Sequence, residues 1–186
     1  MKHFAFFFSV LAVASCKQKT TNELSHDRYL TIGTEYAVQT QQLLGKNLLE
    51  AIQNEGVEEA IRFCNIKAMP LTDSVAQQHS ADIKRVTDKP RNLDNKANAQ
   101  ELKIIKAYKE ALAKGESLKP QLIEEKDKVV YYSPILTNMM CLQCHGSSDA
   151  VLPETMQVLT QLYPDDQATG YDENQVRGLF SIRIDK

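Results

Sequence analysis

Residues 141–145 (CLQCH) constrain this chain more than any other stretch. Two thiols three positions apart, followed directly by an imidazole, have the spacing with which a protein forms thioethers to both vinyl groups of a haem and offers the histidine as an axial iron ligand. The motif therefore predicts one covalently bound c-type haem. Cys141 and Cys144 would carry the thioethers, and His145 would be the proximal ligand of the iron.

Two other interpretations of the motif stay open. One is a redox disulfide of the thioredoxin type, which would be expected to open a helix within a βαβ unit. The other is half of a zinc site, which needs a second pair of ligands, and Cys64 and His79 are poorly spaced to supply it. The haem interpretation is favoured because the histidine follows the second cysteine directly.

The N-terminal end has the pattern of an export signal. Lys2 supplies a positive charge, and residues 4–13 form an apolar run of the length of a secretory signal, too short to span a bilayer. Residues 13–16 (VASC) resemble a bacterial lipobox, in which the cysteine carries the lipid; the alternative is an ordinary signal peptide with a stray Cys16. We predict a lipoprotein signal peptide at residues 1–15 and a lipid-anchored protein of the bacterial envelope, facing the periplasm or the exterior.

The rest of the chain is long enough for one domain. Residues 16–28 are polar and lack an apolar period, which predicts a flexible tether, and residues 29–186 are predicted to form a single haem domain with a real core. The formal net charge is −2, or about −3 once Lys2 is removed, and the chain has no basic block. This charge pattern argues against nucleic acid as a partner.

The cysteine count leaves one thiol without an assignment. Of the four cysteines, Cys16 is predicted to carry lipid and two to carry haem, so Cys64 has no partner for an intramolecular disulfide in an oxidising compartment. Helical spacing places Cys64 on the same apolar face as Ala60 and Ile61, toward the interior. From the residues alone, Cys64 is either a buried thiol that packs as a small hydrophobe or an iron ligand.

Hydrophobic periodicity and turn residues predict a mixture of helices and strands. A long amphipathic helix is expected at residues 29–55, with an apolar stripe that is either core or a dimer seam, followed by a second helix from Val57 that bends or ends at Pro70. Further helices are expected from a capping box at Asn98 and Glu101 to Gly115 and at residues 153–162, and strands at residues 83–87, 129–132 and 178–184.

Residues 88–98 are dense in turn formers and too polar to be core, which predicts a structured loop. Arg91 in this loop and Arg85 just before it are candidates to pair with haem propionates through bidentate guanidinium contacts. The alternative is a solvated surface loop.

Several short motifs, taken in order along the chain, resemble one known family. They are residues 60–65 (AIRFCN), 83–85 (IKR), 90–92 (PRN) with Asn95 and Asn98, 132–135 (YSPI), 141–146 (CLQCHG) and 170–171 (GY). The set resembles the exported single-haem-c domain with a PAS-like fold, which occurs alone in bacteria and as the sensory part of membrane histidine kinases. The likeness covers roughly residues 29–184. It implies an α+β fold, with a PAS-like antiparallel sheet, flanking helices and a long N-terminal helix.

In that family the haem takes a Cys thiolate opposite the motif's His, so the resemblance implies Cys64 as the distal axial ligand. One departure is that residues 170–171 are not followed by the expected second glycine, so the last hairpin is expected to differ. Other ligand candidates are weaker. Met139 and Met140 precede the motif and would have to cross to the opposite haem face, whereas His79 lies on a polar helical segment.

The implied ligands favour a sensor. A thiolate donor stabilises ferric iron and lowers the reduction potential. A change of iron oxidation state, or displacement of the sixth ligand by a small gas molecule, would then shift the Cys64 helix and be detected by a signalling partner protein. The alternative is a low-potential electron-transfer cytochrome, because no kinase or transmembrane output module follows the domain. A haem peroxidase or nitrite-handling enzyme is not expected, since the sequence has no obvious distal His–Arg pair and no second CxxCH motif.

Overall fold

The computed structural model describes residues 21–186, so the predicted signal peptide, Cys16 and the start of the predicted tether lie outside the described residues. No helix within residues 21–186 is long and apolar enough to cross a membrane. In chain order the elements are α1 (Thr21–Glu55), α2 (Val57–Gln78), β1 (Asp82–Val86), the 3-10 helix η1 (Leu93–Asn95), α3 (Ala99–Ala113), β2 (Gln121–Glu124), β3 (Lys128–Leu136), α4 (Met139–His145), α5 (Pro153–Leu162) and β4 (Val176–Asp185).

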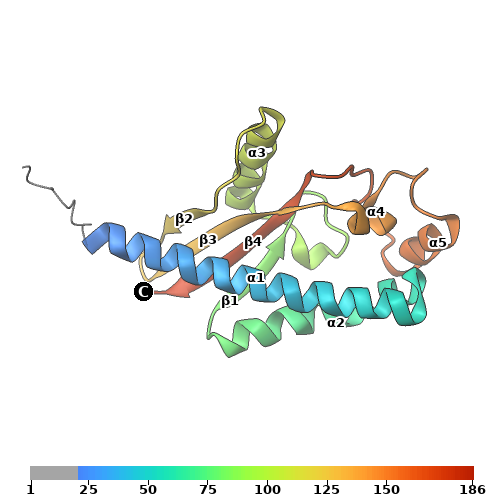
Figure 1. Cartoon of the computed structure of the whole chain (residues 1–186), viewed down its shortest axis with the longest axis horizontal. Helices are drawn as coiled ribbons and strands as arrows, with labels where there is room; N and C mark the ends of the chain where they lie inside the picture. Colours follow the sequence, from blue (N-terminus) through green and yellow to red (C-terminus); the bar gives the residue numbers. More distant parts are fainter. Residues whose placement is uncertain (1–20) are drawn as a thin grey trace, which may run out of the picture.

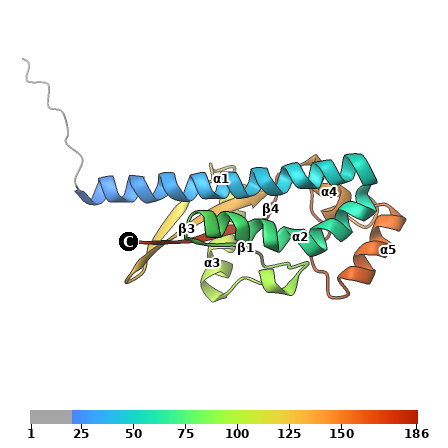
Figure 2. The same cartoon turned by 90° about the horizontal axis from the view of Figure 1, so that it is seen from below.

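The four strands form one antiparallel sheet in the order β1-β4-β3-β2. The last strand, β4, lies between β1 and β3, so that Phe180 pairs with Arg85 on one side and with Ser133 on the other. Helices α1 and α2 pack on one face of the sheet and α3 on the other (Figures 1 and 2). The predicted α+β class, with an antiparallel sheet, flanking helices and a long N-terminal helix, is confirmed.

Side chains that alternate along the central strands contribute to the core on both faces of the sheet. Leu179 packs with Ile105 of α3, whereas its neighbour Phe180 packs on the opposite face with Ala37 of α1 and Val75 of α2. A third cluster joins α2 to α5 beyond the sheet and consists of Ile61, Val151, Val158 and Leu159. The packing therefore ties α2 both to the sheet and to α5.

The two N-terminal helices are longer than predicted. Helix α1 begins at Thr21 rather than Tyr29, so residues 21–28 of the predicted tether are helical. No proline or glycine interrupts residues 21–28, and the side chains of residue 23 and residues 25–28 are exposed, so this segment is helical without an apolar stripe on the core. Helix α2 continues through Pro70 to Gln78, although the proline removes one backbone hydrogen bond.

The sheet also differs in detail from the prediction. Strand β3 continues past Pro134, because β2 pairs only as far as Tyr132 and the proline lies beyond the doubly paired part of the strand. Strand β2 was not predicted, being only four residues long. In the turn before β4, Asn174 has a φ of 58°, the left-handed conformation that glycine adopts most readily.

Helix α1 approaches the sheet closely at Gly33. A Cβ atom at this position would overlap the ring of the buried Tyr131 on β3. The Tyr131 hydroxyl is hydrogen bonded to the hydroxyl of Thr34 at 3.1 Å. The absence of a side chain at Gly33 therefore lets the helix backbone lie directly on the tyrosine ring.

Replacing Gly33 by alanine is expected to lower the free energy of unfolding by roughly 1–3 kcal/mol, the usual effect of overpacking a core. Gly45→Ala on the same helix is the matched control, because no atom lies within 4 Å of a Cβ there; it is expected to be neutral or to stabilise the fold by roughly 0.5–1 kcal/mol. Urea unfolding of protein prepared without haem measures both. A Gly33→Ala protein as stable as the parent would contradict this account of the packing.

Candidate cofactor site

A cavity of about 710 Å³ lies where β3 leads into α4 and β4 begins. Its walls come from α1, α2 and α4, and the sheet contributes Arg85, Ile135 and Phe180. This volume is within the ~300–1,000 Å³ typical of ligand and cofactor sites. Apolar side chains line much of the cavity, and nine polar or charged residues also line it, among them Arg85, His145 and Arg177.

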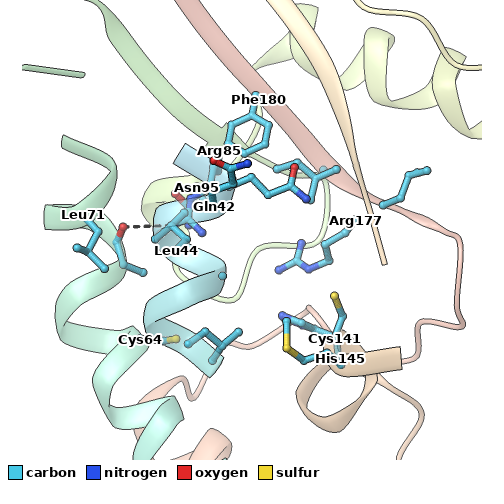
Figure 3. Close-up of a pocket in the computed structure, with 18 of the residues that line it drawn as sticks. Gln42, Leu44, Cys64, Leu71, Arg85, Asn95, Cys141, His145, Arg177 and Phe180 are labelled. Carbon is cyan, nitrogen blue, oxygen red and sulfur yellow. Dashed lines mark hydrogen bonds between the residues drawn. The ribbon is translucent and has the colours of Figure 1, made fainter. Parts of the chain in front are cut away.

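Cys64 on α2 and His145 on α4 line this cavity from opposite sides (Figure 3). Cys141 also lines it, whereas Cys144 packs against the cluster that contains Ile61 of α2. All three cysteines are free thiols. The structure thus brings the motif and Cys64 together, although 77 residues (141 − 64) separate Cys64 and Cys141 in the sequence.

Local sequence explains why the motif folds as a short helix. The Asn138 side chain caps α4 by accepting a hydrogen bond from the Cys141 amide at 3.2 Å. Residues three and four apart share a helix face, which brings Cys141 near both Cys144 and His145. Gly146 ends the helix where any Cβ would come within 2.6 Å of the Leu142 carbonyl oxygen.

A hydrogen bond holds the ring of His145 in one orientation and one tautomer. Its Nδ1 lies 2.6 Å from the Ala168 carbonyl oxygen. Because a carbonyl only accepts, Nδ1 carries the hydrogen, and the lone pair of the neutral ring is on Nε2. Burial, with the positive charges of Arg91 and Arg177, lowers the pKa of His145 well below its usual value. The imidazole is therefore neutral at neutral pH, which is the form that binds iron.

The environment of Cys64 favours the protonated thiol. Burial raises the pKa of the Cys64 thiol, and the charges of Arg85 and Arg91 oppose that shift. Burial likewise raises the pKa of Cys144, to about 11. Arg85 also lines the cavity and is the first countercharge to a thiolate at this position.

Two arginines line the cavity with donors to spare. Arg85 Nη2 donates weakly to the Ala68 carbonyl at 3.5 Å, and Arg177 Nη1 donates to Thr87 Oγ1 at 2.9 Å and to the Lys89 carbonyl at 3.2 Å. The Nε atom of each arginine is buried without a hydrogen-bond partner. Two guanidinium charges on the wall of one cavity favour an anionic ligand.

The two predicted propionate partners lie in different places. Arg85 lines the cavity, but Arg91 lies behind α4, bound to Asp166 and to the Cys144 carbonyl. The structure brings Arg85 together with Arg177, which sequence reasoning missed. An arginine directly before the apolar run of β4 was the only signal that could have singled out Arg177.

The weaker ligand candidates, Met139, Met140 and His79, lie in three different environments. Met139 is 67% exposed, whereas Met140 lines the cavity. His79 stacks on Tyr36 with ring centroids 4.0 Å apart and is hydrogen bonded to Gln39 at 2.6 Å, between α2 and α1. Within residues 21–186, no three His, Cys, Asp or Glu side chains form a group that could hold a metal ion. The half-zinc interpretation, with Cys64 and His79, gains no support.

A family model described as Tll0287-like matches residues 14–185. The chain belongs to the Tll0287-like family. Among solved structures, the crystal structure of the cyanobacterial heme-protein Tll0287 is similar, with a TM-score of 0.65, 17% sequence identity, and coverage of 90% of this chain and 98% of that chain. Comparison with curated proteins finds no match. Membership of the Tll0287-like family confirms the predicted family resemblance, and the structural match supports the fold.

Proposed function

We propose that this Tll0287-like protein binds one c-type haem in the cavity and acts as a redox or small-gas sensor. The observation that carries the proposal is that Cys64 of α2 and His145 of α4 line one cavity from opposite sides, beside the thiols of a CxxCH motif. The solved relative that shares the fold is described as a heme-protein. The side chains of Arg85 and Arg177 add support, because both line the cavity and their positive charges favour an anionic group.

Each residue has a definite part in this proposal. Cys141 and Cys144 would hold the cofactor through thioethers, and His145 and Cys64 would offer an imidazole and a thiolate to its iron. Arg85 and Arg177 would bind its carboxylates. When bound, the haem supplies an iron whose charge and ligand affinity change with its oxidation state.

The position of Cys64 supports sensing. Pro70 lies six residues further along α2 (70 − 64) and removes the hydrogen bond that would otherwise reach the carbonyl of residue 66. A proline inside a helix is a usual place for bending. A change in the bond to Cys64 therefore acts on a helix with a built-in weak point, and α2 packs on α1 through Val75 and Ala37. We propose that α1 passes this displacement to a partner protein.

A second candidate function is low-potential electron transfer. Val38 and Leu136 line the cavity and are also 44% and 38% exposed. An apolar, accessible rim would let a redox partner approach the edge of the cofactor. The same ligand set would give a low reduction potential in either role. The effect of replacing Cys64 on the haem spectrum therefore distinguishes the sensor from the electron carrier.

We also propose that residues 1–15 direct export and that Cys16 carries the lipid anchor, as the sequence of residues 13–16 suggests. In this proposal the haem domain lies outside the cytoplasm and is tethered to the envelope. Such a location is compatible with c-type haem attachment.

Covalent attachment is the first prediction. Protein co-expressed with c-type maturation machinery should retain its colour after acid–acetone extraction, because thioethers at Cys141 and Cys144 survive that treatment. Single Cys141→Ala and Cys144→Ala variants should each keep one thioether and show a red-shifted pyridine haemochrome spectrum. Gln143→Ala, between them, is the control and should behave like the parent. Extraction of the haem from the parent would refute covalent binding.

The ligand role of Cys64 predicts a low-spin ferric haem with the EPR signature of thiolate and imidazole. Cys64→Ala should give a high-spin or water-ligated ferric haem, a higher reduction potential and CO binding to the ferrous form, because a strong anionic donor is removed. Ile66→Ala is the control on the same helix, since Ile66 is 65% exposed. If the Cys64→Ala spectrum matched that of the parent, Cys64 would be a packed thiol, and electron transfer would become the favoured function.

The anchor is tested by fractionation. The parent should partition with the membrane fraction and be released by detergent, whereas Cys16→Ala should be unprocessed or freely soluble, because the lipidated thiol is gone. Ser15→Ala keeps a small residue before the cysteine and serves as the control. Identical fractionation of Cys16→Ala and the parent would show that export occurs without lipidation.

A further inference from the structure

Arg91 and Asp166 form a buried ion pair behind α4. Arg91 Nε and Nη2 each lie 2.9 Å from Asp166 Oδ2, and the two side chains are only 12% and 11% exposed. Arg91 belongs to the loop between β1 and α3, and Asp166 to the loop between α5 and β4. The ion pair therefore joins two loops that are distant in the sequence.

Both side chains also form hydrogen bonds with the backbone around His145. Arg91 Nη2 donates to the Cys144 carbonyl at 2.6 Å, and Asp166 Oδ1 accepts from the Ala168 amide at 2.7 Å. The Ala168 carbonyl is the group that accepts the Nδ1 hydrogen of His145 at 2.6 Å. One ion pair thus holds the peptide group before His145 and also the residue that orients its ring.

The neighbouring backbone completes this arrangement. The Gly170 amide donates to the Gly146 carbonyl at 2.8 Å, and the Tyr171 amide donates to the His145 carbonyl at 2.9 Å. The segment that starts at Asp166 is therefore hydrogen bonded along the C-terminal end of α4. Any movement of Asp166 would shift the acceptor of the His145 hydrogen bond.

Stability alone does not explain such a pair. A buried ion pair contributes little more than apolar side chains of similar volume, because both charges lose their hydration. Partners that orient a metal-ligating histidine through its second ring nitrogen, in contrast, typically contribute 10–100-fold in metal affinity or activity. The contacts of Arg91 and Asp166 match the second role.

We infer that Arg91 and Asp166 are positioning residues for His145, which keep its Nδ1 hydrogen on the Ala168 carbonyl and leave Nε2 as the donor atom. The inference rests on the proposed function in treating His145 as an iron ligand. It gives Arg91 a role other than the predicted contact with haem propionates. Loss of the pair makes the imidazole a weaker and less well oriented donor.

Haem-free protein provides the first test. In a Cys141→Ala/Cys144→Ala background, the imidazole nitrogen-15 shifts of His145 report at neutral pH which ring nitrogen carries the hydrogen, with His145→Asn used to assign the signal. The parent should show the Nδ1–H form. Asp166→Ala should show a mixture with the Nε2–H form, because the Ala168 carbonyl is no longer held. Asp82→Ala breaks another Arg–Asp contact, that with Arg183 at 3.5 Å, and is the control expected to match the parent.

Haem-loaded protein provides the second test. Asp166→Ala should shift the reduction potential to more positive values, since a weaker imidazole donor stabilises ferric iron less. Arg91→Gln keeps one hydrogen-bond donor without the charge and should shift both readouts in the same direction by a smaller amount. Asp82→Ala should leave the potential unchanged.

The outcomes separate this inference from the proposed function. If Asp166→Ala does not fold, Arg91→Gln carries the test. A folded Asp166→Ala or Arg91→Gln protein with the parent's His145 form and the parent's potential would overturn the positioning role, even with haem correctly bound. If the chain takes no haem, the proposed function fails, while the haem-free spectra still decide whether the ion pair orients His145.

Discussion

The contact between Gly33 and Tyr131 is the constraint on which the site depends. It presses the backbone of α1 onto the sheet, and Thr34 adds a hydrogen bond to the tyrosine hydroxyl. The helix then continues beyond this point, and residues such as Leu44 and Leu48 become the wall of the cavity. A side chain at position 33 would lift α1 away from the sheet and with it one side of the cofactor site.

The cavity combines two opposite requirements. Burial suits a large apolar group and keeps His145 neutral, but it also raises the pKa of Cys64 and leaves donors of Arg85 and Arg177 without partners. Under the proposed function, an anionic cofactor with a cationic metal would meet both requirements, because the metal would favour the thiolate and the guanidinium charges would favour the acid groups.

Local patterns in the sequence predicted most elements and part of the site. The capping box at Asn98 and Glu101 and the helix at residues 153–162 depend on neighbouring residues, and the structure has both. The arrangement of the arginines could not be predicted in this way, because it depends on strand order: β4 lies beside β1, which brings Arg177 near Arg85. Arg91 is closer in sequence to Arg85, yet its loop turns toward α4, a result of pairing with Asp166 that no local pattern encodes.

The central position of β4 has a consequence for the order of assembly. Both neighbours of β4, and also the CxxCH helix, precede it in the chain, and Arg183 of β4 meets Asp82 across 101 residues of sequence. Contacts of such long sequence separation form late and slowly, because loop closure costs entropy before the contact repays it. The cysteines of α4 would therefore be accessible while the sheet is still incomplete. Under the proposed function, the haem would be attached at that stage, and the cavity would then form around it.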